Sequence, residues 1–368
     1  MDKQMKILAR KIKNRGKYEK FKISMIALLC GIIVVGLCVF GVYYYVTLKD
    51  AEVVNKAPVS DTVQAYKDGQ DGKKGGNEKP KKDTSSEKED PKDRENIRVD
   101  LEKMRDSFVS QFDILYPNAK LSFYIKDLDS GSTIVYNSEK MNSASVIKLF
   151  IMETVFKQVE KGEYQLTEER AKALEKMITE SHNDSSTLFI DDFGGVDETR
   201  KVTKDNLINV TIARSGYTNT ELNRKMHDTT PPDGPTGYEN YTDVYSVATL
   251  LEKIYNKSLF EKAEHNAKAM ELLKSQKRDN KIPAKIKKEY SHVVVANKTG
   301  ELSQVENDAA IIMGKDYNLI FVVMVNDIPL KGNGSMDFEL KERVQGTIAD
   351  FGLQLTKAYE ESSPKGSK

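Results

Sequence analysis

Cysteine is scarce in this 368-residue chain, and its two copies stand close together near the N-terminus. Cys30 and Cys38 both lie in one apolar stretch, so the long remainder of the sequence has no thiol. Disulfide bonds therefore cannot stabilise that remainder, and cysteine-based metal or redox chemistry is excluded there. A domain of this kind depends on its hydrophobic core.

The motifs of several other chemistries are missing as well. The four histidines are scattered singly, without the His-Glu-x-x-His spacing of a zinc protease. The sequence contains no Gly-x-Ser-x-Gly and no phosphate-binding loop. We therefore expect no metal and no cofactor.

Charge of one sign dominates only at the N-terminus. Nine of residues 1–22 are Lys or Arg and two are acidic, whereas the whole chain has a net charge of +1. No other region is basic enough to indicate nucleic-acid binding. The apolar residues 23–46 follow, and as a helix they would measure roughly 36 Å, enough to cross a bilayer.

This order predicts membrane attachment. By the positive-inside rule, residues 1–22 form a cytoplasmic tail, residues 23–47 a single transmembrane signal anchor, and the rest lies outside the cell. A cleavable signal peptide would have a shorter apolar core and a small-residue cleavage site, but Tyr43, Tyr44 and Tyr45 stand there instead. Residues 48–95 are charged and rich in Gly and Pro, which predicts a disordered linker. We expect the folded domain at residues 96–360 and a polar tail at 361–368.

Within the domain, hydrophobic periodicity predicts strands near both ends and helices between them. The predicted strands are residues 121–125, 133–136, 292–296, 309–313 and 319–325. The predicted helices are residues 97–115, 146–160, 168–180, 245–255, 264–275 and 338–355. This pattern predicts an α+β fold, in which both ends of the domain build one antiparallel sheet flanked by helices, with an all-helical region inserted.

Ser145 and Lys148 form the first candidate catalytic pair. The same Ser-x-x-Lys spacing occurs at Ser85 and at Ser362, but those copies stand in polar segments. Ser145 instead precedes a strongly apolar helical run, and a separation of three residues puts both side chains on one helix face. A lysine in a dry pocket has a lowered pKa and can take the proton of a serine hydroxyl.

Two further motifs follow along the chain. Ser181 and Asn183 form its single Ser-x-Asn, where a hydroxyl could relay a proton and an amide could hold a carbonyl; helix capping is the alternative. Lys298, Thr299 and Gly300 form its single Lys-Thr-Gly, directly after a predicted strand. A cation and a hydroxyl at a strand suit a carboxylate-bearing substrate, and an ordinary turn is the alternative. Gly300 would allow close backbone approach.

These three motifs occur in the order of a known signature, and over residues 100–355 the chain resembles class A β-lactamases and penicillin-binding serine hydrolases. The resemblance implies that Ser145 is acylated while Lys148 and Ser181 move protons. It implies an oxyanion hole made by the backbone N–H groups of Ser145 and Glu301. The implied substrate-binding residues are Asn183, Lys298, Thr299 and Gly300.

The chain departs from the family pattern in the loop that serves deacylation. Class A enzymes carry a glutamate four residues before an asparagine; if Asn223 is that asparagine, Asn219 occupies the glutamate position. Glu221 lies two residues away, and a shifted loop could bring it in. His182 also stands where an aspartate is usual in the middle motif. The sequence therefore predicts acylation of the serine more strongly than efficient hydrolysis of the acyl-enzyme.

The sequence leaves three functions open. They are β-lactam hydrolysis, a DD-peptidase role on acyl-D-Ala peptides of peptidoglycan, and a non-catalytic role as a binding protein or sensor for β-lactams or cell-wall peptides. The expected partners are a β-lactam or acyl-D-Ala peptide and the membrane, through residues 23–47, without nucleic acid. The sequence does not indicate the oligomeric state.

Overall fold

The computed structural model describes residues 99–226 and 238–362. The predicted tail, anchor and linker at residues 1–22, 23–47 and 48–95 lie outside them. Within the described ranges, no helix is both long and apolar enough to cross a membrane.

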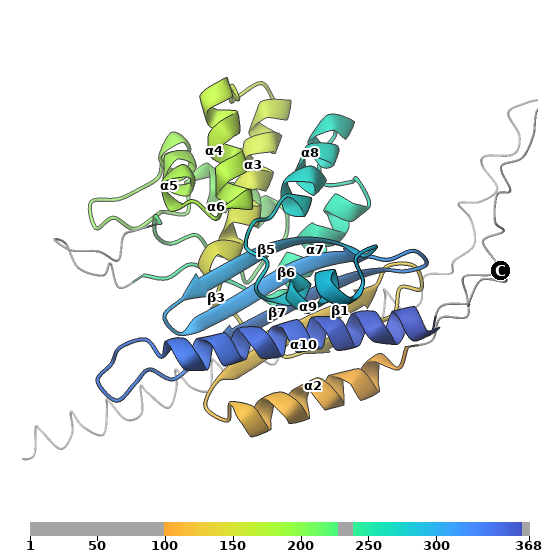
Figure 1. The fold of residues 1–368 in the computed structure, drawn as a ribbon. Helices are drawn as coiled ribbons and strands as arrows, with labels where there is room; N and C mark the ends of the chain where they lie inside the picture. The colour runs from red at the N-terminus through yellow and green to blue at the C-terminus, as the bar shows by residue number, and fades with distance from the viewer. Residues whose placement is uncertain (1–98, 227–237, 363–368) are drawn as a thin grey trace, which may run out of the picture. The chain divides into compact units, whose positions relative to one another are not determined.

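Five antiparallel strands form the central sheet, in the order β2-β1-β7-β6-β5 (Figure 1). The strands are β1 (Lys120–Asp127), β2 (Thr133–Tyr136), β5 (Val294–Leu302), β6 (Val305–Met313) and β7 (Asn318–Asn326). Strands β1 and β7 pair over their whole length, from Lys120 opposite Asn326 to Asp127 opposite Leu319. The predicted sheet from both ends of the domain is thus confirmed.

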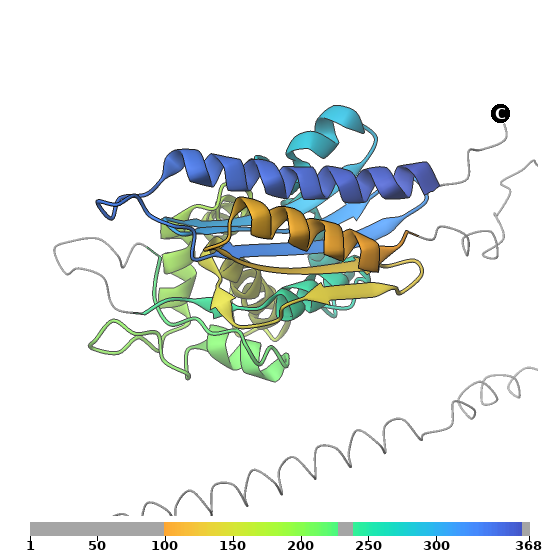
Figure 2. The same cartoon turned by 90° about the horizontal axis from the view of Figure 1, so that it is seen from below.

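Three helices cover one face of this sheet: α2 (Leu101–Leu115) before the first strand, α9 (Ile282–Glu289) before β5, and α10 (Phe338–Ser362) after the last strand. Figure 2 shows α2 and α10 side by side along the strands. Phe108 of α2 stacks on Phe351 of α10 at 4.2 Å between ring centroids, above the buried Phe123 of β1. Helix α10 continues to Ser362, so the predicted polar tail begins inside a helix.

The inserted helical region covers the other face of the sheet (Figure 1). Its helices are α3 (Lys148–Glu160), α4 (Glu168–Thr179), α5 (Asn183–Asp192), α6 (Leu207–Arg214), α7 (Val244–Tyr255) and α8 (Ala263–Lys274). A two-stranded sheet of β3 (Met141–Asn142) and β4 (Tyr241–Thr242) joins it. Helix α3 is buried along nearly its whole length. The four consecutive apolar residues 149–152 project from all of its faces, as is typical of a helix in the interior of a domain.

Candidate active site

Ser145 lies on a single 3₁₀ turn, η2 (Ala144–Ile147), that leads into α3. The regular helix therefore begins at Lys148, two residues later than the sequence indicates. Ala144 has a φ of 44°, a left-handed conformation that is strained for a residue with a Cβ atom and that accumulates at functional sites. Asn240 O accepts from Ser143 N at 2.8 Å, and this bond fixes the turn from the β4 side. Ser145 is partly exposed, whereas its neighbours in the turn are buried.

Lys148 is fully buried beneath this turn. Its Nζ atom donates to Ser181 O and to Asn183 Oδ1, both at 2.7 Å, and to Ser181 Oγ at 3.4 Å. None of its hydrogen bonds within the described residues reaches Ser145. Burial, reinforced by the positive charges of Lys298 and Arg278, lowers the pKa of Lys148 to about 6. At neutral pH this amine is mostly uncharged and can accept a proton.

Ser181 lies in the short link between α4 and α5, and Asn183 is the first residue of α5. The helix-capping alternative applies instead to His182, whose Nδ1 accepts from Ser185 N at 3.3 Å and caps α5. This leaves the side chains of Ser181 and Asn183 directed to Lys148. Ser181 has a φ of 61°, a second strained backbone position in the site.

Lys298 approaches Ser181 from β5. It is fully buried, and its Nζ atom donates to Ser181 Oγ and to Thr299 O, both at 2.9 Å. Burial, with the charges of Lys281 and Arg278, lowers the pKa of Lys298 to about 7. The Ser181 hydroxyl thus lies between two buried amines, which is the arrangement needed to pass a proton across the site.

Gly300 brings strand β5 against the turn that carries Ser145. A Cβ atom at this position would lie 2.8 Å from Ser143 O and 3.1 Å from Val146 N. Only glycine permits this approach. The ordinary-turn alternative for the Lys-Thr-Gly motif is wrong, because all three residues lie inside β5 and pair with β6.

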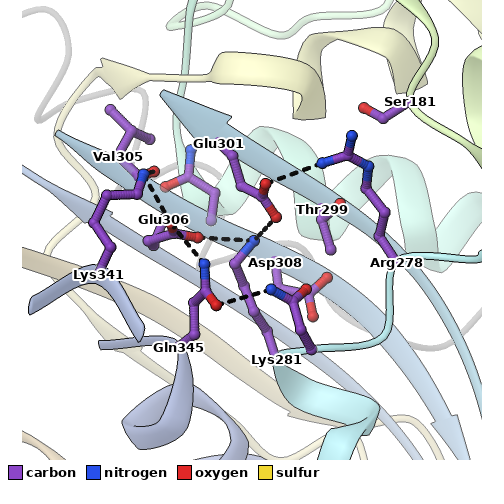
Figure 3. Close-up of polar contacts among 12 residues, drawn as sticks. Ser181, Arg278, Lys281, Thr299, Glu301, Val305, Glu306, Asp308, Lys341 and Gln345 are labelled. Atoms are coloured by element: carbon purple, nitrogen blue, oxygen red, sulfur yellow. Dashed lines mark hydrogen bonds and ion pairs between the residues drawn. The ribbon is translucent and has the colours of Figure 1, made fainter. Parts of the chain in front are cut away.

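A chain of ion pairs holds the next residue of β5 (Figure 3). Glu301 accepts from Lys281 Nζ at 2.7 Å and from Arg278 Nη1 at 3.0 Å. Lys281 also pairs with the buried Glu306 at 2.9 Å, and Lys341 of α10 pairs with Glu306 at 2.8 Å. Burial acts to raise the pKa of Glu301, but Lys281 and Arg278 outweigh it and hold that pKa below its usual range. Sequence reasoning missed this network, whose one signal is the run of basic residues before β5.

Ser145 opens into a cavity of about 90 Å³. Glu301 borders the same cavity, so the two residues of the predicted oxyanion hole, Ser145 and Glu301, both line it. Asn183 lines it as well. Arg224 and Glu239 also border it, and the sequence analysis named neither. They come together because β4 folds back onto residues 221–224: Asn240 Oδ1 accepts from the backbone N–H of Arg224 at 2.9 Å.

The loop expected to serve deacylation lies differently from the prediction. Asn219 Nδ2 donates to Asp243 Oδ2 at 2.6 Å, at the start of α7. Glu221 forms an ion pair with Lys140 at 2.7 Å and accepts from Asn223 Nδ2 at 3.3 Å. Glu221 and Asn223 border a separate, larger cavity of about 670 Å³. Among the described residues, neither Asn219 nor Glu221 borders the cavity of Ser145.

Residues 99–226 and 238–362 contain no group of three or more His, Cys, Asp or Glu side chains placed to hold a metal ion.

The fold and this site define a serine-hydrolase architecture of the β-lactamase type, and comparison with known proteins agrees. The model of the beta-lactamase enzyme family matches residues 104–172 and 169–358, so the chain belongs to that family. No curated protein matches the chain.

Solved structures share the fold at low sequence identity. A β-lactamase from Sphaerobacter thermophilus is 20% identical with a TM-score of 0.57, covering 70% of this chain and 98% of its own. The structure of PBP-A is 21% identical with a TM-score of 0.58, covering 71% of this chain and 97% of its own. An ancestral class A β-lactamase is 18% identical with a TM-score of 0.54, covering 68% and 99%. The predicted family and fold class are confirmed.

Proposed function

We propose that this protein is a membrane-anchored extracytoplasmic serine hydrolase that β-lactams acylate at Ser145. The observation that carries this proposal is the position of the Ser181 hydroxyl between Lys148 and Lys298. An uncharged Lys148 takes the Ser145 proton as Oγ bonds to the lactam carbonyl carbon, and Ser181 passes a proton to the departing nitrogen.

Residues that line the cavity, and buried residues of β5 beside it, serve binding and charge stabilisation. The backbone N–H groups of Ser145 and Glu301 stabilise the oxyanion. Asn183 holds the acyl amide, and Lys298 with Thr299 holds the substrate carboxylate, while Gly300 keeps β5 close. A mutant of PBP-A has been solved as an acyl-enzyme complex with penicillin G, which supports this assignment by similarity of fold.

A DD-peptidase role on acyl-D-Ala peptides is the second candidate. The observation favouring it is that Asn219, and not a glutamate, stands in the expected deacylation loop, with its amide directed to Asp243. Such a peptide would form the same acyl-enzyme at Ser145. A binding protein or sensor would be acylated without turnover, or would dock wall peptides without acylation.

Labelling with a fluorescent penicillin tests acylation. We expect the exported domain to be labelled covalently, and Ser145→Ala to abolish labelling. Ser362→Ala is a matched control because Ser362 belongs to another Ser-x-x-Lys sequence, and its hydroxyl donates to Ala358 O on the outer helix α10. Equal labelling of the Ser145→Ala variant would show that another residue is the nucleophile.

Membrane attachment has its own test. The basic residues 1–22 and the apolar residues 23–47 support an anchor with the catalytic domain outside the cell. Protease added to intact protoplasts should release a fragment that contains Ser145, cut within residues 48–95. Protection of that fragment, or its secretion without cutting, would contradict the anchor.

A further inference from the structure

Hydrolysis of an acyl-enzyme needs a water molecule beside the ester and a group that takes its proton. The two side chains that the sequence suggests for this task are bound elsewhere, Asn219 to Asp243 and Glu221 to Lys140. The cavity that Ser145 shares has about 90 Å³, well above the roughly 10–15 Å³ that one water molecule needs. A carboxylate that borders this cavity would be placed to take the proton of such a water molecule.

Among residues 99–226 and 238–362, two carboxylates border it, Glu239 and Glu301. Both oxygens of Glu301 are occupied, Oε1 by Lys281 and Oε2 by Arg278 (Figure 3). Glu301 therefore serves as a fixed part of the wall. It has no free oxygen with which to take a proton from water.

Glu239 differs from Glu301 in that only one of its two carboxylate oxygens accepts hydrogen bonds from described residues. Arg224 donates twice to Glu239 Oε2, from Nε at 3.1 Å and from Nη2 at 2.9 Å. The other oxygen, Oε1, has no hydrogen-bond partner among the described residues. Arg224 is almost fully buried, with 5% of its side chain exposed, whereas Glu239 retains 36%. One oxygen is thus anchored by a buried cation, and part of the Glu239 side chain remains exposed to solvent.

The backbone around Glu239 is also held. Glu239 O accepts from Asn223 Nδ2 at 3.0 Å, and the next residue, Asn240, accepts from Ser143 N beside the nucleophile. The loop asparagine of the family pattern therefore positions Glu239 through the main chain. This geometry ties the carboxylate and the turn of Ser145 to one frame.

We propose that Glu239 is the general base that hydrolyses the acyl-enzyme, an assignment that rests on the proposed function of Ser145. A water molecule in the cavity gives one proton to Glu239 Oε1 while its oxygen bonds to the acyl carbon. The ester bond to Ser145 Oγ then breaks, and Oγ takes up the proton that Glu239 releases. The products are a free carboxylic acid and the regenerated serine.

The test separates acylation from deacylation. The purified full-length protein is mixed with a chromogenic cephalosporin, and single-turnover kinetics with mass spectrometry of the adduct give both rates. Glu239→Gln keeps an acceptor for Arg224 but cannot take a proton, so deacylation should slow by about 10²–10⁴-fold while acylation stays within about threefold. Glu163→Gln, at an exposed ion pair with Lys161 beyond the end of α3, is the matched control and should leave both rates unchanged.

A second variant guards against a purely structural effect. Glu239→Ala should also slow deacylation, and added formate should restore it, because a small carboxylate can occupy the vacated space. Deacylation at the wild-type rate in Glu239→Gln would overturn the assignment, as would a wild-type acyl-enzyme that persists for hours. Absence of acylation in the wild type would overturn the proposed function, and this assignment with it.

Discussion

Two segments near Ser145 are built in opposite ways. Strand β5 brings Lys298 and Gly300 to the site as buried residues, fixed by pairing with β6 and by contact with the Ser145 turn. Residues 219–223 belong to no strand: the backbone bridge of Glu221 with Tyr241 and the buried Leu222 hold them, together with side-chain bonds such as the half-exposed pair of Glu221 with Lys140. The acylation machinery thus belongs to the central sheet and the buried turn, whereas the side chains of Asn219 and Glu221 are bound away from the cavity of Ser145.

Replacement of the buried base should have the largest effect. Lys148→Ala removes the group that takes the Ser145 proton, so acylation by fluorescent penicillin should slow by about 10²–10⁴-fold. Stopped-flow or gel-based labelling measures the rate. Lys161→Ala, at the exposed end of the same helix, should label normally. Wild-type labelling in Lys148→Ala would place the base elsewhere.

Acylation should depend on pH in a bell shape. The rate rises as pH passes about 6, because Lys148 must lose its proton, and falls as pH passes about 7, because Lys298 then loses the charge that holds the substrate carboxylate. The charge of Lys298 lowers the pKa of Lys148, so both limbs belong to the coupled pair. Below the lower limb the rate should fall about tenfold per pH unit.

The pH profile has a clear control. Lys298→Gln should lose the falling limb and move the rising limb to higher pH, because the charge that lowers the pKa of Lys148 is gone, with a lower maximal rate. A wild-type rate that stays flat from pH 5 to pH 8 would contradict the assigned protonation states.

Close packing of β5 gives a smaller effect. In Gly300→Ala the new methyl group would meet Ser143 O, so β5 must move away from the turn. We expect the free energy of unfolding to fall by about 1–3 kcal/mol and acylation to slow, as measured by chemical denaturation and labelling. Gly332→Ala, with no atom within 4 Å of the added Cβ, should change neither.

The same contrast explains what the sequence could predict. The five strands of the large sheet were recognisable from their apolar patterns and the three motifs from their short chemical spacings, whereas β3 and β4, of two residues each, were missed. Helices α5, α6 and α9 were missed, because they have only eight to ten residues and show little more than two turns of periodicity. In α9 the pattern is also interrupted by Pro283 in the first turn, and α6 begins only after the capping Asn206.

The cavity partners could not be predicted for a different reason. Arg224 and Glu239 approach Ser145 only because β4 folds back onto the loop, and Arg278 meets Glu301 only across the end of β5. The two residues of each pair are far apart in the sequence, so no short motif indicates that they meet. The family pattern placed Asn219 at the position of the deacylation glutamate. Such a pattern indicates where a residue stands in the chain, but it does not determine the direction of its side chain.

The smallest expected effect is in the loop itself. Asn219→Glu supplies the residue that class A enzymes carry at the aligned position, but here it would place a carboxylate against Asp243, which is nearly buried and already caps α7. Two like charges in contact should lower the free energy of unfolding by about 1–3 kcal/mol, without faster hydrolysis. Glu221→Gln is the matched control: it breaks only a partly exposed ion pair, worth about 0–1 kcal/mol. Urea denaturation and steady-state hydrolysis measure both variants. If Asn219→Glu instead accelerates hydrolysis at unchanged stability, the side chain at position 219 reaches the acyl-enzyme, and the loop, not Glu239, directs the water.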